Sequence, residues 1–310
     1  MAKAPIVLFV YNRVDHFQKT FDALSKCPEA KESNLFIFSD GPKDELTAPK
    51  VQAVRDAIHA IQTSDCFKSI TVNESPVNRG LAQSVITGVT KIIEQFGRII
   101  VLEDDCLASP YFLSFMNRCL DAFENNPKIG SIAGYAPPIE FPKDYTADTF
   151  LAWRSCSWGW ATWKDRWQNV DWDLKKVSDF YRDPKLLKRL NANGNDRFMR
   201  LYRQTKGNGS SWSVRFGAHL VKHGYYTLYP RYSYIQNIGC DESGVHSKND
   251  DEALIRVNLD NAIPAPSLNL PLYSEVLQKI LCRYYSGGFL FFLKRALFTK
   301  LIVVSEWLKR

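Results

Sequence analysis

Three consecutive carboxylates, Glu103, Asp104 and Asp105, end the apolar run in RIIVLEDDC, which extends from Arg98 to Cys106. The run is mostly β-branched without polar alternation, as is typical of a strand buried on both faces of a parallel sheet. Adjacent carboxylates repel one another and need compensating cations or hydrogen-bond donors. Because open α/β sheets bind ligands where such strands end, this acidic triplet predicts a divalent metal site that holds a substrate diphosphate. The alternative is a solvated acidic turn that caps the next helix.

Alternating apolar segments precede the acidic triplet. Short runs of strand type occur at 6–10, 35–38 and 69–72, and each is followed by apolar residues at helical spacing. Strands that alternate with helices in this way are typical of an α/β fold with a doubly wound, mostly parallel sheet flanked by helices. We therefore expect the acidic triplet on a central strand of such a sheet.

Polar residues follow each of these earlier strands. Arg13, Asp40 and Arg79 come after the first, second and third strand, so we expect them to converge on the edge that carries the acidic triplet. An arginine suits a diphosphate or a uracil ring, and Asp40 suits a base N–H or a ribose hydroxyl. Together they indicate a nucleotide site. In the alternative interpretation, Asp40 only closes its turn and Arg79 only caps a helix.

The segment SCSWGWATWKDRW, residues 155–167, is rich in tryptophan. Trp158, Trp160, Trp163 and Trp167 could form a flat surface on which a sugar packs, as bases stack on aromatic platforms. Alternatively, Trp160, Trp163 and Trp167 have the spacing of one helical face and would pack in the core.

A polar loop, GCDESGVH, occupies 239–246 and contains His246 in a chain with only five histidines. A histidine near a metal-bound diphosphate could bind either the metal or the phosphate. The alternative is an exposed histidine without a role.

The composition is that of a folded soluble protein, with 45% hydrophobic and 24% charged residues and a net charge of +7. The positive charge suits an anionic partner without identifying it. Seven scattered cysteines without a CxxC pair argue against a disulfide framework or zinc site and favour a reducing compartment. No apolar run is long enough to cross a bilayer.

The C-terminal tail combines bulky apolar residues with basic residues every few positions from Lys279 onward. This pattern predicts a basic amphipathic helix lying in an anionic membrane interface. The alternative is a helix packed on the domain or at a dimer interface.

Six motifs occur in a characteristic order: FVYNR, FSDGPK, NRGLAQS, VLEDD, SWGWATW and QNIGCDESGVH. Together they resemble bacterial glycosyltransferases of the GT-A fold, in the group related to family 2 transferases and to the Golgi N-acetylglucosaminyltransferases. The similarity extends from about Pro5 to His246. It implies a GT-A domain at 1–248, with a nucleotide-sugar half at 1–106 and an acceptor half at 107–248, followed by a C-terminal extension at 249–310.

The resemblance assigns roles residue by residue. The acidic triplet would be this chain's version of the Asp-x-Asp motif, with Asp105 and His246 at Mn²⁺ or Mg²⁺ and Trp158 and Trp160 on the acceptor side. The donor-binding set that it implies is Tyr11, Arg13, Asp40, Asn78, Arg79, Glu103 and Asp104.

The catalytic base departs from the pattern of the resembled enzymes. Those enzymes use the aspartate of a Trp-Asp pair, whereas this chain has Trp212 followed by Ser213. A serine is a weak base at neutral pH. We therefore predict Asp241 or Glu242 in this role, with Asp196 as a further candidate. The resemblance favours inversion, in which a base on the opposite face of the sugar activates the acceptor hydroxyl.

The resulting prediction is a metal-dependent hexosyl- or N-acetylhexosaminyltransferase that uses a UDP-sugar and a glycan or lipid-linked acceptor in bacterial surface polysaccharide synthesis. We expect it in the cytoplasm, peripherally at the inner face of the membrane. A nucleotidyltransferase would need a glycine-rich loop and a lysine after the first strand, which VYNRVDHF does not provide. The remaining alternative is a nucleic-acid or anionic-ligand binding protein with a structural acidic turn, although the basic residues are not striped and no nucleic-acid module is visible.

Overall fold

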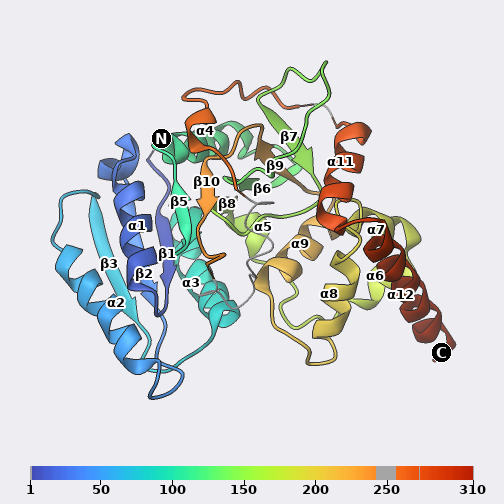
Figure 1. Cartoon of the computed structure of the whole chain (residues 1–310), viewed down its shortest axis with the longest axis horizontal. Helices are drawn as coiled ribbons and strands as arrows, with labels where there is room; N and C mark the ends of the chain where they lie inside the picture. Colours follow the sequence, from blue (N-terminus) through green and yellow to red (C-terminus); the bar gives the residue numbers. More distant parts are fainter. Residues whose placement is uncertain (1, 242–255, 272, 310) are drawn as a thin grey trace.

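The computed structural model describes residues 2–241, 256–271 and 273–309. Among these residues, the centre is an eight-stranded sheet in the order β3-β2-β1-β4-β8-β6-β9-β7 (Figure 1), beside which β5 and β10 form a two-stranded sheet. The strands are β1 (Ile6–Val10), β2 (Asn34–Ser39), β3 (Ser69–Glu74), β4 (Arg98–Glu103), β5 (Cys106–Ala108), β6 (Ile129–Ala133), β7 (Thr149–Ala152), β8 (Trp160–Trp163), β9 (Tyr226–Pro230) and β10 (Ile235–Asn237).

The large sheet is mostly parallel. β3, β2, β1 and β4 pair in parallel, as do β6 and β9. β8 joins these two groups through antiparallel pairing with β4 and β6, and β7 pairs antiparallel with β9. The strands other than β7 and β8 therefore point the same way, and their carboxyl ends share one edge.

Helices cover both faces of the sheet. Along β1, Ile6 and Leu8 pack beneath α1, α2 and α4, whereas Val7 and Phe9 pack beneath α3 and α9, because successive side chains of a strand alternate between faces. The predicted α/β fold, with a doubly wound, mostly parallel sheet flanked by helices, is confirmed. The helices are α1 (Val14–Ser25), α2 (Ala48–Ile61), α3 (Leu81–Phe96), α4 (Phe112–Phe123), α5 (Lys164–Trp167), α6 (Ser178–Arg182), α7 (Pro184–Leu190), α8 (Arg197–Gln204), α9 (Trp212–Lys222), α11 (Glu275–Ser286) and α12 (Phe289–Leu308).

The tryptophan-rich segment is not one helix. Trp160 and Trp163 are the ends of strand β8, and only α5 is helical. Trp160 is fully buried and packs on Trp167 and Trp212, with ring centroids 5.7 and 4.9 Å apart. Trp163 belongs to the core on the other face, where its Nε1–H donates to the carbonyl of Leu120 at 3.2 Å. The helical spacing was therefore misleading, although these tryptophans do pack in the core.

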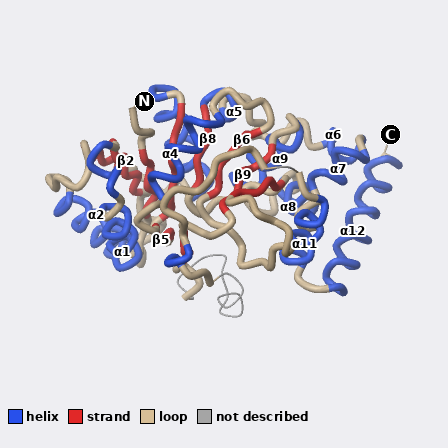
Figure 2. The backbone as a smooth tube through the Cα atoms, turned by 90° about the horizontal axis from the view of Figure 1, so that it is seen from above, coloured by secondary structure: helices blue, strands red, loops and turns tan. Residues whose placement is uncertain are grey.

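The sequence predicted one helix in the C-terminal tail, whereas the structure has two, α11 and α12, which differ in their packing. Leu277 and Leu281 of α11 are 1% exposed, and Gln278 Nε2 donates to the carbonyl of Leu151 at 2.7 Å. α11 thus shares a hydrophobic core with the sheet, while the division at 248 and 249 stays a prediction. α12 lies at one end of the molecule (Figure 2). No helix in the described part of the chain combines the length and apolarity needed to cross a bilayer.

Candidate functional site

The acidic triplet lies at the carboxyl edge of the sheet. Glu103 is the last residue of β4 and stands beside Phe9 of β1. Ser39, the last residue of β2, stands beside Val10, and Asp40 follows it. The register therefore brings the ends of β1, β2 and β4 together, as expected for parallel strands.

Arg13 joins the two aspartates of the acidic triplet. It immediately precedes α1, and its Nη2 donates to Asp105 Oδ2 at 2.9 Å and to Asp104 Oδ1. The three side chains are exposed by only 17%, 14% and 5%, so water screens these ion pairs weakly. Burial raises the pKa of Asp104 to about 6, and Arg13 limits this rise. Burial alone would lower the pKa of Arg13, but the two aspartates outweigh it and raise that pKa.

Glu103 has a different environment. The indole of Trp212, the first residue of α9, donates a hydrogen bond to its carboxyl group. Part of Glu103 remains accessible, yet burial, together with the charges of Asp105 and Asp104, raises its pKa to about 8. Burial and the neighbouring carboxylates therefore favour the protonated form of Glu103, which relieves part of the repulsion within the acidic triplet.

The chain after β10 lies directly against Asp105. Asn237 Nδ2 donates to Asp105 Oδ1 at 3.1 Å, and the backbone N–H of Ile238 donates to the carbonyl of Asp105 at 2.9 Å. A Cβ atom on Gly239 would lie 2.3 Å from Asp105 Oδ2 and 3.1 Å from Arg13 Nη1. Glycine is thus required here because the backbone approaches the carboxylate too closely for any side chain.

Asp40 connects the turn that follows β2 with the residues that precede α3. Its carboxylate accepts hydrogen bonds from the backbone N–H groups of Gly41, Arg79 and Gly80, each at 2.9 Å, and it is 8% exposed. Asn78 Nδ2 donates to the carbonyl of Gly41 at 2.8 Å, and the residues Asn78 and Arg79 are exposed. The structure favours the turn-closing interpretation of Asp40, and donor contacts of these three residues stay predictions.

Tyr11 carries an unsatisfied polar group at the same edge. It follows β1, next to Val10, whose carbonyl accepts the N–H of Asp40 at 3.3 Å. Its hydroxyl is buried and has no hydrogen-bond partner within the described ranges. A buried hydroxyl without a partner is costly, so a polar ligand group would be favoured here.

Of the two predicted bases, Asp241 and Glu242, only Asp241 belongs to the described residues. Its side chain is 49% exposed, and its Oδ2 lies 3.3 Å from His16 Nε2. The same Nε2 lies 3.2 Å from the carbonyl oxygen of Ile238, so His16 supports the chain after β10 at two points. Glu242 and His246 lie outside the described residues.

Asp196, the further base candidate, is committed to an ion pair. Arg154 Nη1 donates to its Oδ1 at 2.9 Å, and Asp196 is 7% exposed. Burial would raise its pKa, but Arg154, Arg197 and Arg200 outweigh that effect and hold it at about 2. Such a carboxylate is a poor proton acceptor at neutral pH.

The two predicted acceptor tryptophans differ. The prediction for Trp160 is wrong, because its ring is fully buried between Trp167 and Trp212 and presents no surface to an acceptor. Trp158 is partly exposed and packs edge-on against Tyr135, with ring centroids 4.7 Å apart. Its contact with an acceptor stays a prediction.

The oxygen ligands available here fit Mg²⁺ or Mn²⁺ only if a substrate contributes. No three His, Cys, Asp or Glu side chains within the described ranges are arranged around a common metal position. Mg²⁺ typically takes one or two protein carboxylates and completes its shell with substrate phosphates and water. Asp105, partly exposed and hydrogen-bonded to the neutral Asn237, is suited to be that carboxylate. The metal itself stays a prediction.

Fold and site together define a doubly wound α/β protein in which Arg13 binds Asp104 and Asp105 at the carboxyl edge of the sheet. No family model and no curated protein matches the chain. Among solved structures it is similar to a crystal structure of S. aureus TarS, with a TM-score of 0.45 and 9% identity over 75% of this chain and 36% of that one. It is also similar to TarS 1–349, with a TM-score of 0.41 and 11% identity over 74% of this chain and 59% of that one.

A third similar structure is TarS 1–349 in complex with UDP-GlcNAc, with a TM-score of 0.40 and 10% identity over 55% of this chain and 48% of that one. This chain therefore spans 36–59% of the chains to which it is similar. TM-scores and sequence identities this low assign neither a family nor an activity to the chain. The relation to Golgi N-acetylglucosaminyltransferases stays a prediction.

Several residues of the site were not singled out from the sequence. Asn237 and Gly239 lie within the motif QNIGC, so their place in an ordered motif was an available signal. His16 follows Arg13 by three residues, a spacing that places both on one side of a helix start. Thr20 Oγ1 donates to the carbonyl of Asp104 at 2.7 Å, and nothing in the sequence indicated that contact.

Proposed function

We propose that this protein is a metal-dependent glycosyltransferase that moves a hexosyl or N-acetylhexosaminyl group from a UDP-sugar to a glycan or lipid-linked acceptor in bacterial surface polysaccharide synthesis. The observation that carries the proposal is the partly exposed Asp105 at the carboxyl edge, held between Arg13 and Asn237. An acidic residue fixed at the ligand edge of a doubly wound sheet suits a cation-bound diphosphate. The six motifs in their characteristic order are the reason for proposing that the transferred group is a sugar.

Each side chain would have a distinct task. Asp105 would hold Mn²⁺ or Mg²⁺ together with the donor diphosphate, and the metal would neutralise the charge that develops on the departing diphosphate. Arg13 keeps Asp105 in position through its 2.9 Å hydrogen bond. Glu103, at the end of β4, would form a hydrogen bond with a hydroxyl of the donor.

Asp241 is the base we favour for an inverting reaction. Its carboxylate is half exposed, which leaves it accessible to an acceptor hydroxyl, and His16 lies beside it. A base must come within hydrogen-bond reach of the proton that it removes. Glu242, the next residue in the chain, is the second candidate.

Calorimetric titration of UDP, with GDP and CDP as competitors, tests the proposal directly. We expect UDP to bind in the presence of Mn²⁺ and to bind at least about tenfold more weakly after chelation. If no nucleotide binds in either condition, the acidic triplet is structural. The result would then favour the alternative, a nucleic-acid or anionic-ligand binding protein.

Gly239→Ala should impair the same binding. The added Cβ would clash with Asp105 Oδ2 at 2.3 Å, and therefore must displace either the loop or the metal-binding carboxylate. We expect UDP affinity with Mn²⁺ to fall at least about tenfold, or 1.4 kcal/mol, as measured by calorimetry. Gly207→Ala is the control, because a Cβ there meets no atom within 4 Å and only the backbone at φ +74° is strained. Equal affinity of the two variants would contradict the assigned role of Gly239.

We also propose that α12 binds an anionic membrane surface. Eleven of its large apolar side chains are exposed by 38–79%. Six of them recur at intervals of three or four residues and form one stripe, which Lys294 and Lys300 flank on the helix surface. The stripe consists of Leu290, Leu293, Leu297, Leu301, Val304 and Leu308. Apolar insertion with flanking positive charge is the pattern of an interfacial helix.

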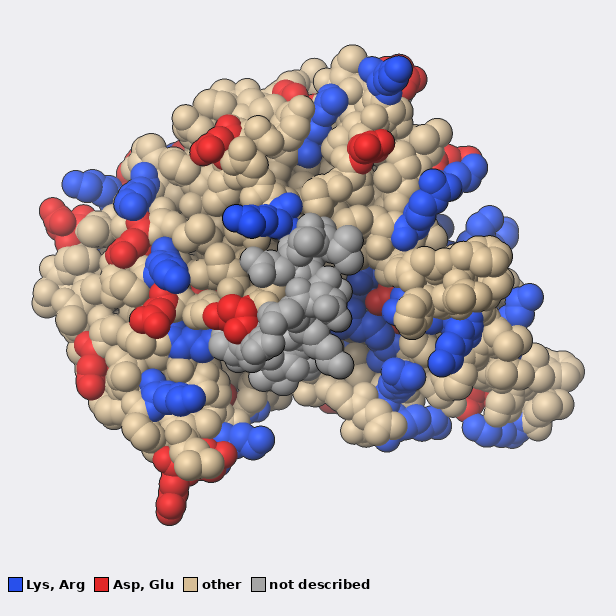
Figure 3. All heavy atoms as spheres, viewed as in Figure 1, with Lys and Arg blue, Asp and Glu red and all other residues tan. Residues whose placement is uncertain are grey.

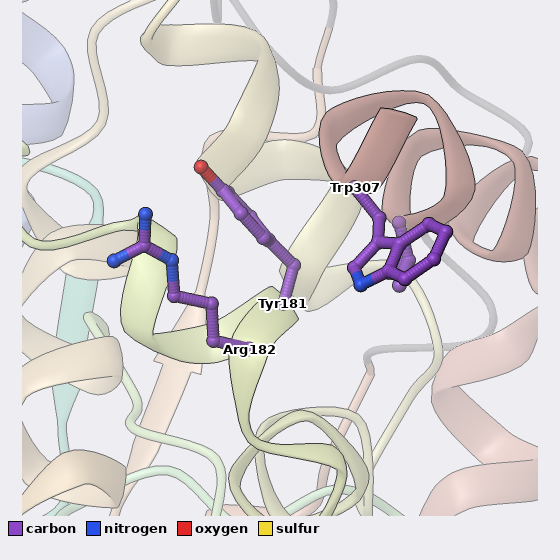
Figure 4. A pocket seen from close by; sticks show the side chains of 4 residues that line it. Tyr181, Arg182 and Trp307 are labelled. Atoms are coloured by element: carbon purple, nitrogen blue, oxygen red, sulfur yellow. The ribbon is translucent and has the colours of Figure 1, made fainter. Parts of the chain in front are cut away.

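The end of α12 supports this arrangement. Trp307 and Val303 form, with Tyr181 and Arg182 of α6, a pocket of about 140 Å³. In Figure 4 the rings of Tyr181 and Trp307 flank the space between the two helices. Tryptophan and tyrosine favour the boundary between water and lipid, because each combines an apolar ring with a polar atom.

Replacing both flanking lysines should weaken vesicle binding. We expect Lys294→Gln with Lys300→Gln to lower affinity for phosphatidylglycerol vesicles roughly 30-fold, since each lysine contributes about 1 kcal/mol near an anionic surface. Vesicle sedimentation at fixed ionic strength measures this. The control pair is Lys19→Gln with Lys50→Gln, on α1 and α2 at the opposite end of the molecule (Figure 1). A dimer whose formation depends on the same stripe, without vesicle binding, would refute the membrane proposal.

A further inference from the structure

A cluster of arginines lies deep in the acceptor half, apart from the acidic triplet. Arg154, Arg197 and Arg200 surround the single carboxylate of Asp196. Arg154 donates to Asp196 Oδ1 at 2.9 Å, and Arg200 Nη1 lies 3.5 Å from Oδ2. We call these four residues the arginine cluster. Basic side chains outnumber acidic ones over α8 and the C-terminal helices on the face shown in Figure 3.

The charges of the arginine cluster do not balance. Among the described residues, three guanidinium groups face the carboxylate of Asp196, which leaves an excess of two positive charges in a partly buried place. Arg197 is 4% exposed, and the hydrogen bonds that its Nη2 donates within the described ranges go to two neutral oxygens, Ser155 Oγ at 3.2 Å and the carbonyl of Ser213 at 3.4 Å. Burial, together with Arg154 and Arg200, lowers the pKa of Arg197 to about 9. A buried charge without a counter-charge is unfavourable, so the cluster is suited to bind an anion.

The arginine cluster is accessible from the surface. The side chain of Arg200 is 46% exposed, and those of Arg154 and Asp196 are exposed by 12% and 10%. Arg295 of α12 is close enough to lower the pKa of Arg200 further, after burial and Arg154. An anion that approaches past Arg200 would therefore meet more guanidinium groups than carboxylates.

The position of the arginine cluster connects two parts of the proposed enzyme. On one side, Trp212 contacts Glu103 and the next residue, Ser213, contacts Arg197, so two consecutive residues of α9 connect the acidic triplet with the cluster. On the other side, Asn195 Nδ2 donates to the carbonyl of Phe292 in α12 at 2.7 Å. The cluster thus lies between the donor site and the exposed apolar helix.

We propose that the arginine cluster binds a phosphate group carried by the acceptor, so that the preferred acceptor class is a phosphorylated, lipid-linked sugar. This inference rests on the proposed function and deepens it. Guanidinium groups bind phosphate through paired hydrogen bonds, and the apolar stripe of α12 would accommodate the lipid that carries it. The acidic triplet and the arginine cluster would then hold the donor and acceptor anions separately.

Thermal unfolding with sodium phosphate, compared with sodium chloride at equal ionic strength, tests the anion site. At phosphate concentrations about ten times the dissociation constant, we expect the melting temperature to rise about 2–4 °C. Arg197→Gln should abolish the rise, and Arg200→Gln, at a half-exposed position, provides a second variant if the first fails to fold. Arg203→Gln, an exposed arginine on the same helix, is the matched control and should retain the rise.

Repeating the experiment with saturating UDP and Mg²⁺ distinguishes the donor site from the arginine cluster. We expect the phosphate-dependent rise to persist, because the two anions occupy different places. If UDP abolishes it, the arginine cluster holds the donor diphosphate and our assignment is wrong. A phosphate-dependent rise in a protein that binds no UDP would retain the anion site while refuting the proposed transferase.

The source of the phosphate is tested with two lipids. An isoprenyl phosphate in detergent should bind at least tenfold more weakly to Arg197→Gln than to the wild type, whereas binding to phosphatidylglycerol vesicles should be unchanged. An equal loss for both would identify a bulk lipid headgroup as the ligand and overturn the acceptor assignment. The acceptor assignment is also overturned if phosphate stabilises the wild type, Arg197→Gln and Arg203→Gln equally.

Discussion

Asp105→Ala is expected to abolish Mn²⁺-dependent UDP binding and to lower sugar transfer at least about 100-fold, the effect typical of removing one group that stabilises developing charge. The reason is geometric. Asp105 is partly exposed at the edge of the sheet, and its two oxygens are oriented by Arg13 at 2.9 Å and Asn237 at 3.1 Å. Calorimetry with UDP, with and without Mn²⁺, measures the binding, and a radiolabelled UDP-sugar measures the transfer.

The control for Asp105→Ala is the substitution of a carboxylate that lies outside the site. Asp121→Asn on α4 removes a charge that is paired with Arg98 and 40% exposed, so it should leave UDP binding unchanged. Asp105→Asn keeps the shape of the side chain and still accepts from Arg13, yet it should lose most of the metal dependence. If Asp105→Asn binds UDP and Mn²⁺ as the wild type does, the carboxylate is structural.

The sequence was sufficient to predict the parallel part of the sheet from β1 to β4. β1 and β4 are uninterrupted apolar runs, and such runs between helical segments allow few arrangements other than a buried parallel sheet. Arg13 and the acidic triplet were predictable for the same reason, because parallel strands bring their carboxyl ends together. Strand order and register then place them within hydrogen-bonding distance.

Other features depend on contacts between distant parts of the chain. The role of Gly239 follows from its approach to Asp105, more than a hundred residues earlier, which no local pattern encodes. Trp160 was misassigned because its spacing from Trp167 also fits a helix, whereas pairing with β4 makes it a strand residue. The arginine cluster joins Arg154 to Asp196 across 42 residues, and its charge imbalance exists only in the folded protein.

Arg13→Gln is expected to lower the free energy of unfolding by about 3–5 kcal/mol at pH 8, the usual effect of breaking a buried ion pair from one side. Without Arg13, Asp104 and Asp105 repel each other in a place where their side chains are exposed by only 5% and 14%. Urea unfolding followed by tryptophan fluorescence gives the change. Lys175→Gln, which breaks a surface pair with Asp173, is the control and should leave the unfolding free energy unchanged.

The pH dependence and a double variant identify the cause of the Arg13→Gln effect. The pKa of Asp104 in the folded protein, about 6, lies above its ordinary value, so the unfolded chain loses this proton first and stability falls as pH rises through 6. Removing Arg13 raises that pKa further, and the loss of stability should therefore be smaller at pH 5 than at pH 8. Adding Asp104→Asn should recover at least about 1 kcal/mol at pH 8, because the buried unpaired charge disappears. A loss that is independent of pH and unaffected by Asp104→Asn would mean that Arg13 stabilises the fold through packing, and not through the acidic triplet.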